Sequence, residues 1–242
     1  MAAISGHNAS VEFGDGYTTD AFAWAIETTS ESVETTPFVA PKNSVTRTTG
    51  ITQWSGTYRC RLQTTVWTNL ATENVYYSAN VHAFSFSLIS TAIPTTPFAA
   101  DTHTHAAGLM SASGDYTCYL DSSVPLPVSG DTDQLGMRIG AGITVIIPIV
   151  VIATSVGVST DGSDRHVTVS WESNGDFSDD RPVVGIIGDA TFRATKETPD
   201  IPTVPEYAGQ ILITKLAVSM RAARDAAEYT YTFVGSGDLT AS

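Results

Sequence analysis

The feature of this sequence that most constrains its fold is a repeat whose two copies are nested rather than consecutive. Residues 21–62 resemble residues 83–120, and residues 156–177 resemble residues 216–239. The order along the chain is therefore first half, first half, second half, second half. A plain tandem duplication gives a different order, whereas one copy inserted into a loop of the other gives this one. A repeat of this kind decides the architecture before any other pattern is considered.

Short identical stretches carry the first half of the repeat, and the offset between the copies shrinks along it as short loop deletions would produce. The matched positions are Ala21-Phe22 with Ala83-Phe84, Thr35-Thr36-Pro37-Phe38 with Thr95-Thr96-Pro97-Phe98, Gly56 with Gly114, Tyr58 with Tyr116 and Cys60 with Cys118. We therefore predict one β topology used twice, with Cys60 superposing on Cys118 and Gly237 on Gly175.

Apolar and polar residues alternate in most patterned segments, which is typical of half-buried β-strands. The predicted inward-facing sets are Phe22, Trp24 and Ile26; Tyr58, Cys60 and Leu62; Val167, Val169 and Trp171; and Tyr229, Tyr231 and Phe233. Helix signals are confined to residues 64–75 and 220–228, and the second stretch is predicted to be a hairpin loop because its match in the other copy is a turn. The Pro-rich residues 122–136 and 196–209 are predicted to be loops outside the sheet, because proline offers no backbone donor. They are candidates for arms that reach a neighbouring subunit.

The predicted fold class is all-β, a β-sandwich or partial barrel whose unit occurs twice, with the second copy inserted in the first. The outer domain is expected to comprise residues 1–78 plus 183–242. The inserted domain is expected to comprise residues 79–182.

Residues 139–160 carry no charge and are long enough to cross a bilayer. They are rich in Ile, Val and Thr and are interrupted by glycines and Pro148, which favours two buried strands joined near Pro148 over a membrane segment or a fusion-type peptide. The N-terminal residues have neither the basic region nor the apolar stretch of a signal peptide. We expect no membrane association.

The chain is acidic, with 25 acidic and 12 basic residues and a net charge of −13. Duplex DNA-binding proteins need basic residues to displace counterions, so the composition argues against DNA binding while leaving a role in which adhesion to DNA would be harmful. Charged residues make up 15% of the chain, against about 25% in typical soluble domains. This favours a surface that is largely covered by neighbouring subunits, although extracellular β domains have a similar composition.

No catalytic motif occurs, so the chain is not expected to be an enzyme, and no catalytic, cofactor-binding or metal-binding residue is assigned. His103 and His105 could form a metal pair, but no well-spaced ligand completes it except Asp101. The acidic loops 161–164 and 176–180 match no calcium loop and are interpreted as solvated turns. Cys60 and Cys118 are interpreted as small buried apolar residues, not as a disulfide.

Several short motifs agree in order and position with one family of viral proteins. They are Gly6 to Val11, Trp24 to Ile26, Thr35-Thr36, Gly50, Trp54-Ser55-Gly56, and Phe233, Gly235, Gly237 and Leu239. The unit in which they occur resembles the major tail tube proteins of long-tailed bacteriophages. Gln53 departs from the Asp usual in the family. The inner copy keeps the pattern in diluted form, with Ser113-Gly114 lacking the tryptophan and Ser173 in place of the first glycine.

The resemblance implies a structural virion protein whose subunits form rings, which stack into a tube that conducts phage DNA. Its partners would be other copies of itself, the tape measure protein, other tail proteins, and DNA passing through the lumen without specific binding. It would be located in the virion tail after assembly in the bacterial host cytoplasm. The alternatives are another ring or decoration protein of the virion (a tail terminator, baseplate hub or capsid decoration protein) or a carbohydrate-binding β-sandwich module. Single-unit family members usually form hexamers, so two units per chain imply a ring of three chains, or of six if the inner copy lies outside the ring.

Overall fold

The computed structural model describes residues 2–7, 9–13, 17–19, 21–35, 45–61, 71–72, 81–119, 126–139, 143–158, 165–176, 178–179, 184–194, 206–220 and 228–241. Sixteen strands are described and no helix, so the all-β prediction is confirmed. In chain order the strands are β1 (Ala2–His7), β2 (Ala9–Phe13), β3 (Tyr17–Thr19), β4 (Ala21–Glu34), β5 (Arg47–Arg61), β6 (Ala71–Thr72), β7 (Val81–Pro94), β8 (His105–Tyr119), β9 (Thr132–Ile139), β10 (Ile143–Val158), β11 (Arg165–Ser173), β12 (Ser178–Asp179), β13 (Ile187–Ala194), β14 (Glu206–Met220), β15 (Glu228–Gly235) and β16 (Thr240–Ala241).

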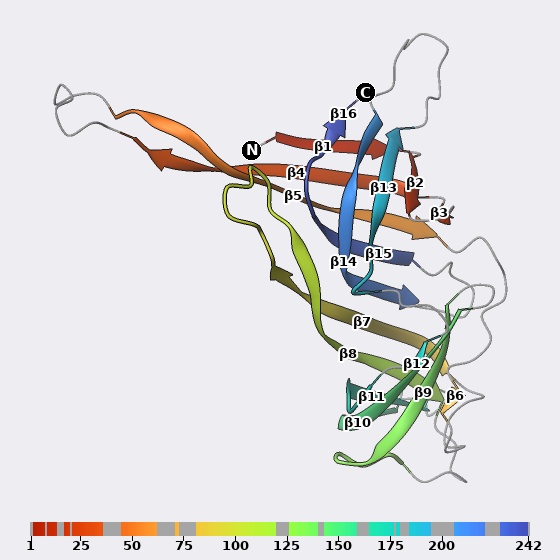
Figure 1. Ribbon diagram of the computed structural model, residues 1–242. Coiled ribbons are helices and arrows are strands. Elements are labelled where there is room, and N and C mark those ends of the chain that lie inside the picture. Colours follow the sequence, from red (N-terminus) through yellow and green to blue (C-terminus); the bar gives the residue numbers. More distant parts are fainter. Residues whose placement is uncertain are drawn as a thin grey trace, which may run out of the picture.

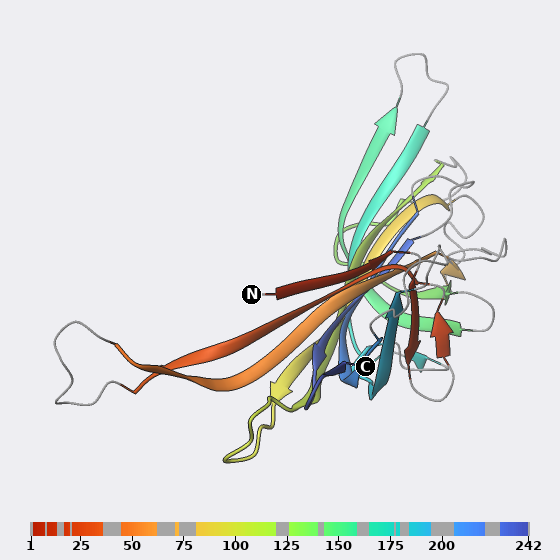
Figure 2. The same ribbon diagram turned by 90° about the horizontal axis from the view of Figure 1, so that it is seen from above.

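The strands form one antiparallel sheet that does not close into a barrel. Its main path runs β1-β4-β5-β15-β14-β7-β8-β11-β10-β9-β6 (Figure 1). The hairpin of β4 and β5, drawn in orange, extends well beyond the body of the molecule (Figure 2). The hairpin of β10 and β11 also projects from the body, in a different direction.

Two groups of strands within this sheet pair in the same order. In the first group the path is β4-β5-β15-β14, and in the second it is β7-β8-β11-β10. The smaller strands follow the same scheme, because β13 and β16 pair with β14 as β9 and β12 pair with β10. β14 then pairs with β7, so the second group continues the sheet of the first.

The register also agrees between the groups, down to its irregularities. Trp24 pairs with Tyr58, and Phe84 pairs with Tyr116. The hairpin of β4 and β5 has two register shifts, and the hairpin of β7 and β8 has two at corresponding places. Further shifts occur in β14 between Ile213 and Lys215 and in β10 between Val151 and Ala153. The register therefore aligns Trp24 with Phe84, two residues away from the sequence alignment of Ala21-Phe22 with Ala83-Phe84.

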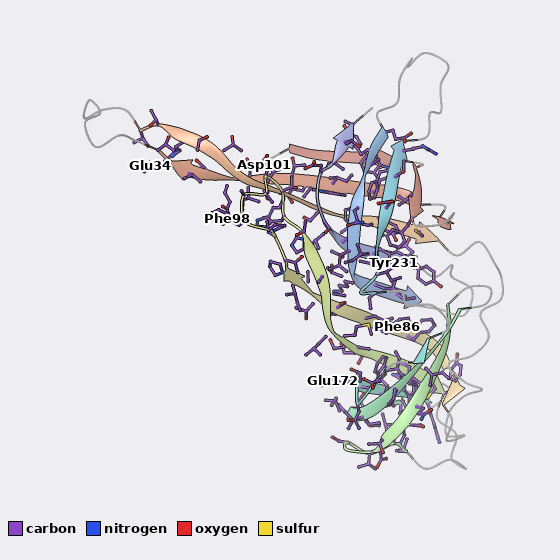
Figure 3. All side chains as sticks on the ribbon, viewed as in Figure 1. Glu34, Phe86, Phe98, Asp101, Glu172 and Tyr231 are labelled. Carbon is purple, nitrogen blue, oxygen red and sulfur yellow. The ribbon has the colours of Figure 1, made fainter. Side chains whose placement is uncertain are left out.

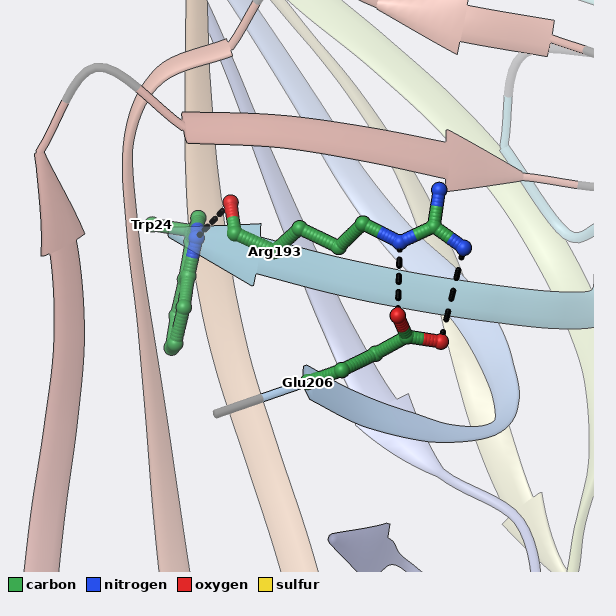
Figure 4. A network of polar contacts seen from close by, with 3 residues as sticks. All are labelled: Trp24, Arg193 and Glu206. Atoms are coloured by element: carbon green, nitrogen blue, oxygen red, sulfur yellow. Dashed lines mark hydrogen bonds and ion pairs between the residues drawn. The ribbon is translucent and has the colours of Figure 1, made fainter. Parts of the chain in front are cut away.

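β14 is long enough to take part in two layers of the structure. The C-terminal part of β14 pairs with β15 and β7, whereas its N-terminal part pairs with β13, which in turn pairs with β2. This second layer covers the apolar face of β4: the Trp24 ring lies 5.9 Å from the rings of both Phe192 and Tyr207. The Trp24 indole also donates to the Arg193 carbonyl at 3.3 Å, and the Arg193 side chain pairs with Glu206 (Figure 4).

Alternation along the strands separates an apolar face from a polar one. The apolar face carries the core, and the predicted inward-facing residues that the structure describes there are buried or packed against it: Trp24, Ile26, Tyr58, Cys60, Val167, Val169, Trp171, Tyr229, Tyr231 and Phe233. The opposite face presents serine, threonine and scattered charged residues. The side chains of Phe22 and Leu62 lie outside the described residues.

The described part of the uncharged stretch 139–160 lies in β9 and β10, but not in the predicted arrangement. β10 continues through Pro148, which pairs with Gln134 of β9 and accepts a hydrogen bond from the Asn174 amide at 2.7 Å. The predicted junction near Pro148 is therefore wrong, and β9 instead ends at Ile139, before β10 begins at Ile143. The irregularity in β10 is the register shift after Val151, which needs no proline.

Parts of the two Pro-rich stretches, predicted to be loops, lie in strands. The first ends within β9 and the second within β14, because both strands begin before the stretches end. Residues 122–125 and 196–205 lie outside the described part of the chain. So do residues 64–70, 73–75 and 221–227, which include most of the two segments with helix signals.

Candidate assembly interface

Several of the motif residues, though far apart in sequence, lie together where the C-terminal end of β15 pairs with the middle of β5. Gly56 is the strand partner of Phe233, and the Trp54 ring lies 5.9 Å from the Phe233 ring. The Trp54 indole donates a hydrogen bond to the Gly237 carbonyl at 2.9 Å. We call this set, with Gly235, the tryptophan cluster.

Each glycine of the tryptophan cluster is needed at its position for a different physical reason. A Cβ at Gly235 would collide with the Trp54 indole, and a Cβ at Gly56 would collide with the Ala25 carbonyl and the Phe233 ring. Gly237 has a φ of 97°, a conformation that other residues rarely adopt. The match in the second group, Gly175, has a φ of 130°. The two glycines therefore hold equivalent positions, in the turns that follow β15 and β11.

The loop between β7 and β8 binds directly to the tryptophan cluster. The Thr52 amide donates to the Asp101 carbonyl at 2.9 Å, and the His103 amide donates back to the Thr52 carbonyl at 3.1 Å. The Gly237 amide donates to the His103 carbonyl at 2.8 Å. Thus one strand group already recognises the other through backbone hydrogen bonds. Figure 3 labels Asp101 in this loop and Phe98 near its tip, whose side chain is fully exposed.

The two histidines of this loop make structural hydrogen bonds. His103 Nδ1 lies 2.9 Å from Thr96 Oγ1, and His105 Nδ1 lies 3.0 Å from the Gly235 carbonyl oxygen. Their rings are 6.1 Å apart. Within the described residues, no group of three or more His, Cys, Asp or Glu side chains is placed to hold a metal ion. His166 lies in β11, away from this pair, and the side chains of His7 and His82 lie outside the described residues.

The seam between the groups is the pairing of β14 with β7. Leu216 pairs with Leu88, and Val218 pairs with Phe86, all four being buried on the apolar face. On the polar face a shallow groove of about 450 Å³ crosses this seam. Its lining includes Arg59, Ser85, Ser87, Asp115 and Glu228. Arg59 and Glu228 form an ion pair at 2.8 Å.

Burial changes the acidity of several core groups. Desolvation, the largest cause, raises the pKa of Tyr58 well above its ordinary value, and it raises the pKa of Tyr229 in the same direction. Desolvation also raises the pKa of the Cys118 thiol to about 11. Cys118 donates to the Val167 carbonyl at 3.8 Å, and neither Cys118 nor Cys60 forms a disulfide. On the surface, a hydrogen bond from Arg193 lowers the pKa of Glu206.

The sequence pointed to the members of the tryptophan cluster but not to the seam or to the loop that docks beside it. The alternation of apolar and polar residues does not reveal the strand order, because any two strands that each have one apolar and one polar face can pair side by side. The one available signal was the sequence match between Thr35 and Thr95, which directly follow the ends of β4 and β7. The Thr35 amide donates to the Thr46 carbonyl as the Thr95 amide donates to the Thr104 carbonyl, both at 2.9 Å.

Comparisons with protein-family profiles, with characterised proteins and with solved structures find no match to this chain. In the described part of the chain, no helix has the length and apolar character needed to cross a membrane.

Proposed function

We propose that this chain is a structural subunit of the tail tube of a long-tailed bacteriophage, whose rings stack around a lumen that conducts DNA. The observation that supports this most is the pairing of β14 with β7, through which one strand group continues the sheet of another with the same strand order. Repeating such an edge-to-edge contact by rotation generates a ring, and stacking of rings generates a tube.

The shared strand order and register support a further part of the proposal, that the second group is a copy of the first inserted between β5 and β13. β6 pairs with β9 as β2 pairs with β13, so β6 belongs with the inserted copy. This would move the start of the inserted unit from residue 79 to residue 71 or earlier.

The expected partners follow from the tube. They are other copies of this chain, the tape measure protein, other tail proteins and DNA that passes without specific binding. A net charge of −13 is compatible with a wall to which DNA does not adhere. The proposed location is the virion tail, after assembly in the cytoplasm of the bacterial host.

Negative-stain electron microscopy of the purified chain tests the proposal. Tubes or stacked rings are the expected result. Single closed rings would favour a tail terminator, baseplate hub or other ring protein of the virion, and discrete monomers at high concentration would favour a carbohydrate-binding module. Either of the last two outcomes would overturn the tube assignment.

A further inference from the structure

The two strand groups differ at one edge, and that difference carries an inference about how copies of the chain meet. The C-terminal part of β14 has a partner on both sides, β15 on one and β7 on the other. The corresponding part of β10 pairs with β11 on one side. On its other side, no strand in the described part of the chain pairs with residues 153–158.

Burial shows what the missing strand would cover. Val218 of β14 and Val156 of β10 hold equivalent positions, because they pair with Tyr229 and Val167, which in turn pair with Cys60 and Cys118. Val218 is 1% exposed, whereas Val156 is 47% exposed. Val158, at the end of the same edge, is 58% exposed. An apolar strand edge of this kind is a template for pairing with another chain.

The loop beside β10 contacts the start of this edge: Ser129 Oγ donates to the Ile152 carbonyl and Thr154 Oγ1 donates to the Pro127 carbonyl, both at 2.8 Å. The Gly130 amide donates to the Val151 carbonyl at 2.8 Å, in the same way as the Gly185 amide donates to the Ile213 carbonyl in the first group, also at 2.8 Å. In the first group β7 nevertheless pairs with β14 from Lys215 onward. A strand next to residues 153–158 would therefore lie beside this loop, as β7 lies beside β14 and Gly185 in the first group.

The strand that corresponds to β7 is β4, and its matching edge is occupied by β1. β7 receives β14 at residues 84–89. By register these positions correspond to residues 24–29 of β4, and β1 pairs with residues 23–28. Both β1 and β14 run antiparallel to the strand that they cover. Within one chain, β1 thus occupies the place beside β4 that β14 occupies beside β7.

We propose that residues 153–158 of β10 pair with β4 of a second copy of this chain, and that β1 leaves β4 to make room. The seam within the chain fixes the register, in which Val156 lies opposite Ile26, Ser155 opposite Glu27 and Thr154 opposite Thr28. Val156 then meets Ile26 on the apolar face, as Val218 meets Phe86, whereas two threonines take the place of Leu216 and Leu88. Ser155 meets Glu27 on the polar face. This inference rests on the proposed function, and it adds which edges join and which strand controls their joining.

Paired cysteines test the register. The variant Ser155→Cys with Glu27→Cys, in a Cys60→Ala and Cys118→Ala background, should form disulfide-linked dimers and trimers on a non-reducing gel. Directly opposite residues lie about 4.5–5.5 Å apart between Cα atoms, within the span of a disulfide. The two positions lie at opposite ends of the main sheet of one chain, so a link between them joins two chains.

The chain supplies matched controls. Ala217→Cys with Ser87→Cys occupies the same positions in the internal seam and should give an intrachain disulfide with no change in mass. Ser155→Cys with Thr29→Cys is displaced by one pair of residues and should cross-link poorly. Equal linkage of the displaced pair, or none for Ser155 with Glu27 while the internal control links, would overturn the register.

A second measurement uses the unmodified protein. On assembly, amide hydrogen exchange should slow at residues 153–158 and should stay slow at residues 215–220. Unchanged exchange at residues 153–158 in assembled protein would overturn the interface even if the cysteine variants failed to fold.

Locking β1 tests its role. Ala3 and Glu27 are register partners, so Ala3→Cys with Glu27→Cys in the same background should hold β1 in place when oxidised. Assembly should then be lost, and reductant should restore it, whereas deletion of residues 2–7 should speed assembly. Assembly that is insensitive to oxidation would refute the displacement of β1. Tubes without the predicted cross-link would leave the proposed function standing, and cross-linked dimers without tubes would leave the interface standing and remove the function.

Discussion

The contact between Trp54 and Gly235 shows how the two strand groups solve one packing problem differently. In the first group the indole lies directly over Gly235. In the second group the register places Ala112 where Trp54 stands and Ser173 where Gly235 stands, and the Ala112 amide donates to Ser173 Oγ at 3.0 Å. A large residue over a glycine is thus replaced by two small residues joined by a hydrogen bond.

This exchange gives a stability prediction. Gly235→Ser should lower the free energy of unfolding by about 1–3 kcal/mol, because overpacking forces the indole or the backbone to move. Trp54→Ala alone should cost about 3–5 kcal/mol. The double variant should cost at least about 0.5 kcal/mol less than the sum of the two. Urea denaturation of the four proteins measures this, and strict additivity would contradict the packing argument.

Alkaline pH should destabilise the protein through its buried phenols and thiol. Folding raises the pKa of Tyr58, Tyr229 and Cys118, so the unfolded chain loses these protons at lower pH than the folded chain does. Their contribution to stability is complete below the ordinary pKa values, 9.0 for Cys and 10.0 for Tyr, and is lost as pH rises through the folded values. Each group contributes a slope of at most about 1.4 kcal/mol per pH unit.

Cys118→Ala isolates one of these groups. Its unfolding free energy should fall less steeply with pH than that of the parent between pH 9.0 and about 11, and with the same slope near neutral pH. Chemical denaturation at a series of pH values measures the two slopes. Identical slopes across this window would show that Cys118 does not contribute to it.

At the scale of elements, the hairpins of the two groups differ in what they contact. The outer part of the β4–β5 hairpin is exposed on both faces, including Val33 at 45% and Val45 at 58%. The β7–β8 loop instead binds Thr52 and Gly237 of the first group. The first hairpin therefore contributes little to the stability of a single chain, and the second contributes more.

Shortening each hairpin should separate these contributions. Replacing residues 32–49 by a two-residue turn should change the melting temperature little but should prevent assembly into rings or tubes. The matched replacement of residues 92–107 should lower the melting temperature, because it removes the backbone hydrogen bonds to Thr52 and Gly237. Thermal denaturation and microscopy of both variants provide the readouts, and a large fall in melting temperature for the first variant would contradict the assignment.

The positions of the strands were largely predictable from the sequence, whereas the order in which the strands pair was not. Alternation identified the core faces of β4, β5, β11 and β15, because side chains in a strand have a period of two. The same period explains the alignment error at Ala21-Phe22, since a shift by two residues keeps every side chain on its face. Glycines and a proline suggested a break in residues 139–160, but backbone pairing with β9 keeps β10 continuous through Pro148. The tryptophan cluster was foreseen only as separate motifs.

At the scale of the whole molecule, the number of units per chain sets the order of the proposed ring. Because the pairing of β14 with β7 joins both groups in one sheet, they should occupy equivalent positions in the proposed ring. We therefore expect three chains per ring and six units. Native mass spectrometry of a single ring gives the count directly, and six chains would mean that the second group lies outside the ring.

The charge of the inner wall gives a second prediction at this scale. We expect a net negative wall, supplied by strand residues and not by the Pro-rich stretches. On the polar face the described acidic residues include Glu27, Asp115, Glu172 and Glu228, and the described bases include Arg59 and Lys215. If this face lines the lumen, tubes of the Glu172→Lys variant should retain short duplex DNA at low salt where parent tubes do not.

Glu34→Lys makes the same change of charge at the exposed end of the β4–β5 hairpin (Figure 3). It should leave DNA retention unchanged if that hairpin lies away from the wall. Equal retention by both variants would show that net charge alone decides it. A solved tube with a basic inner wall would contradict the link between chain charge and DNA passage.

The seam between β14 and β7 also limits how many units a ring can contain and how far its assembly depends on protein concentration. A ring built from this chain can contain only an even number of units, so closures with five or seven units are not available to it. Half of its edge contacts are made within single polypeptides, and these form at any dilution. Only the other half, the contacts between separate chains, depend on the concentration of the protein in the cell. The timing of assembly is therefore controlled at this one type of contact.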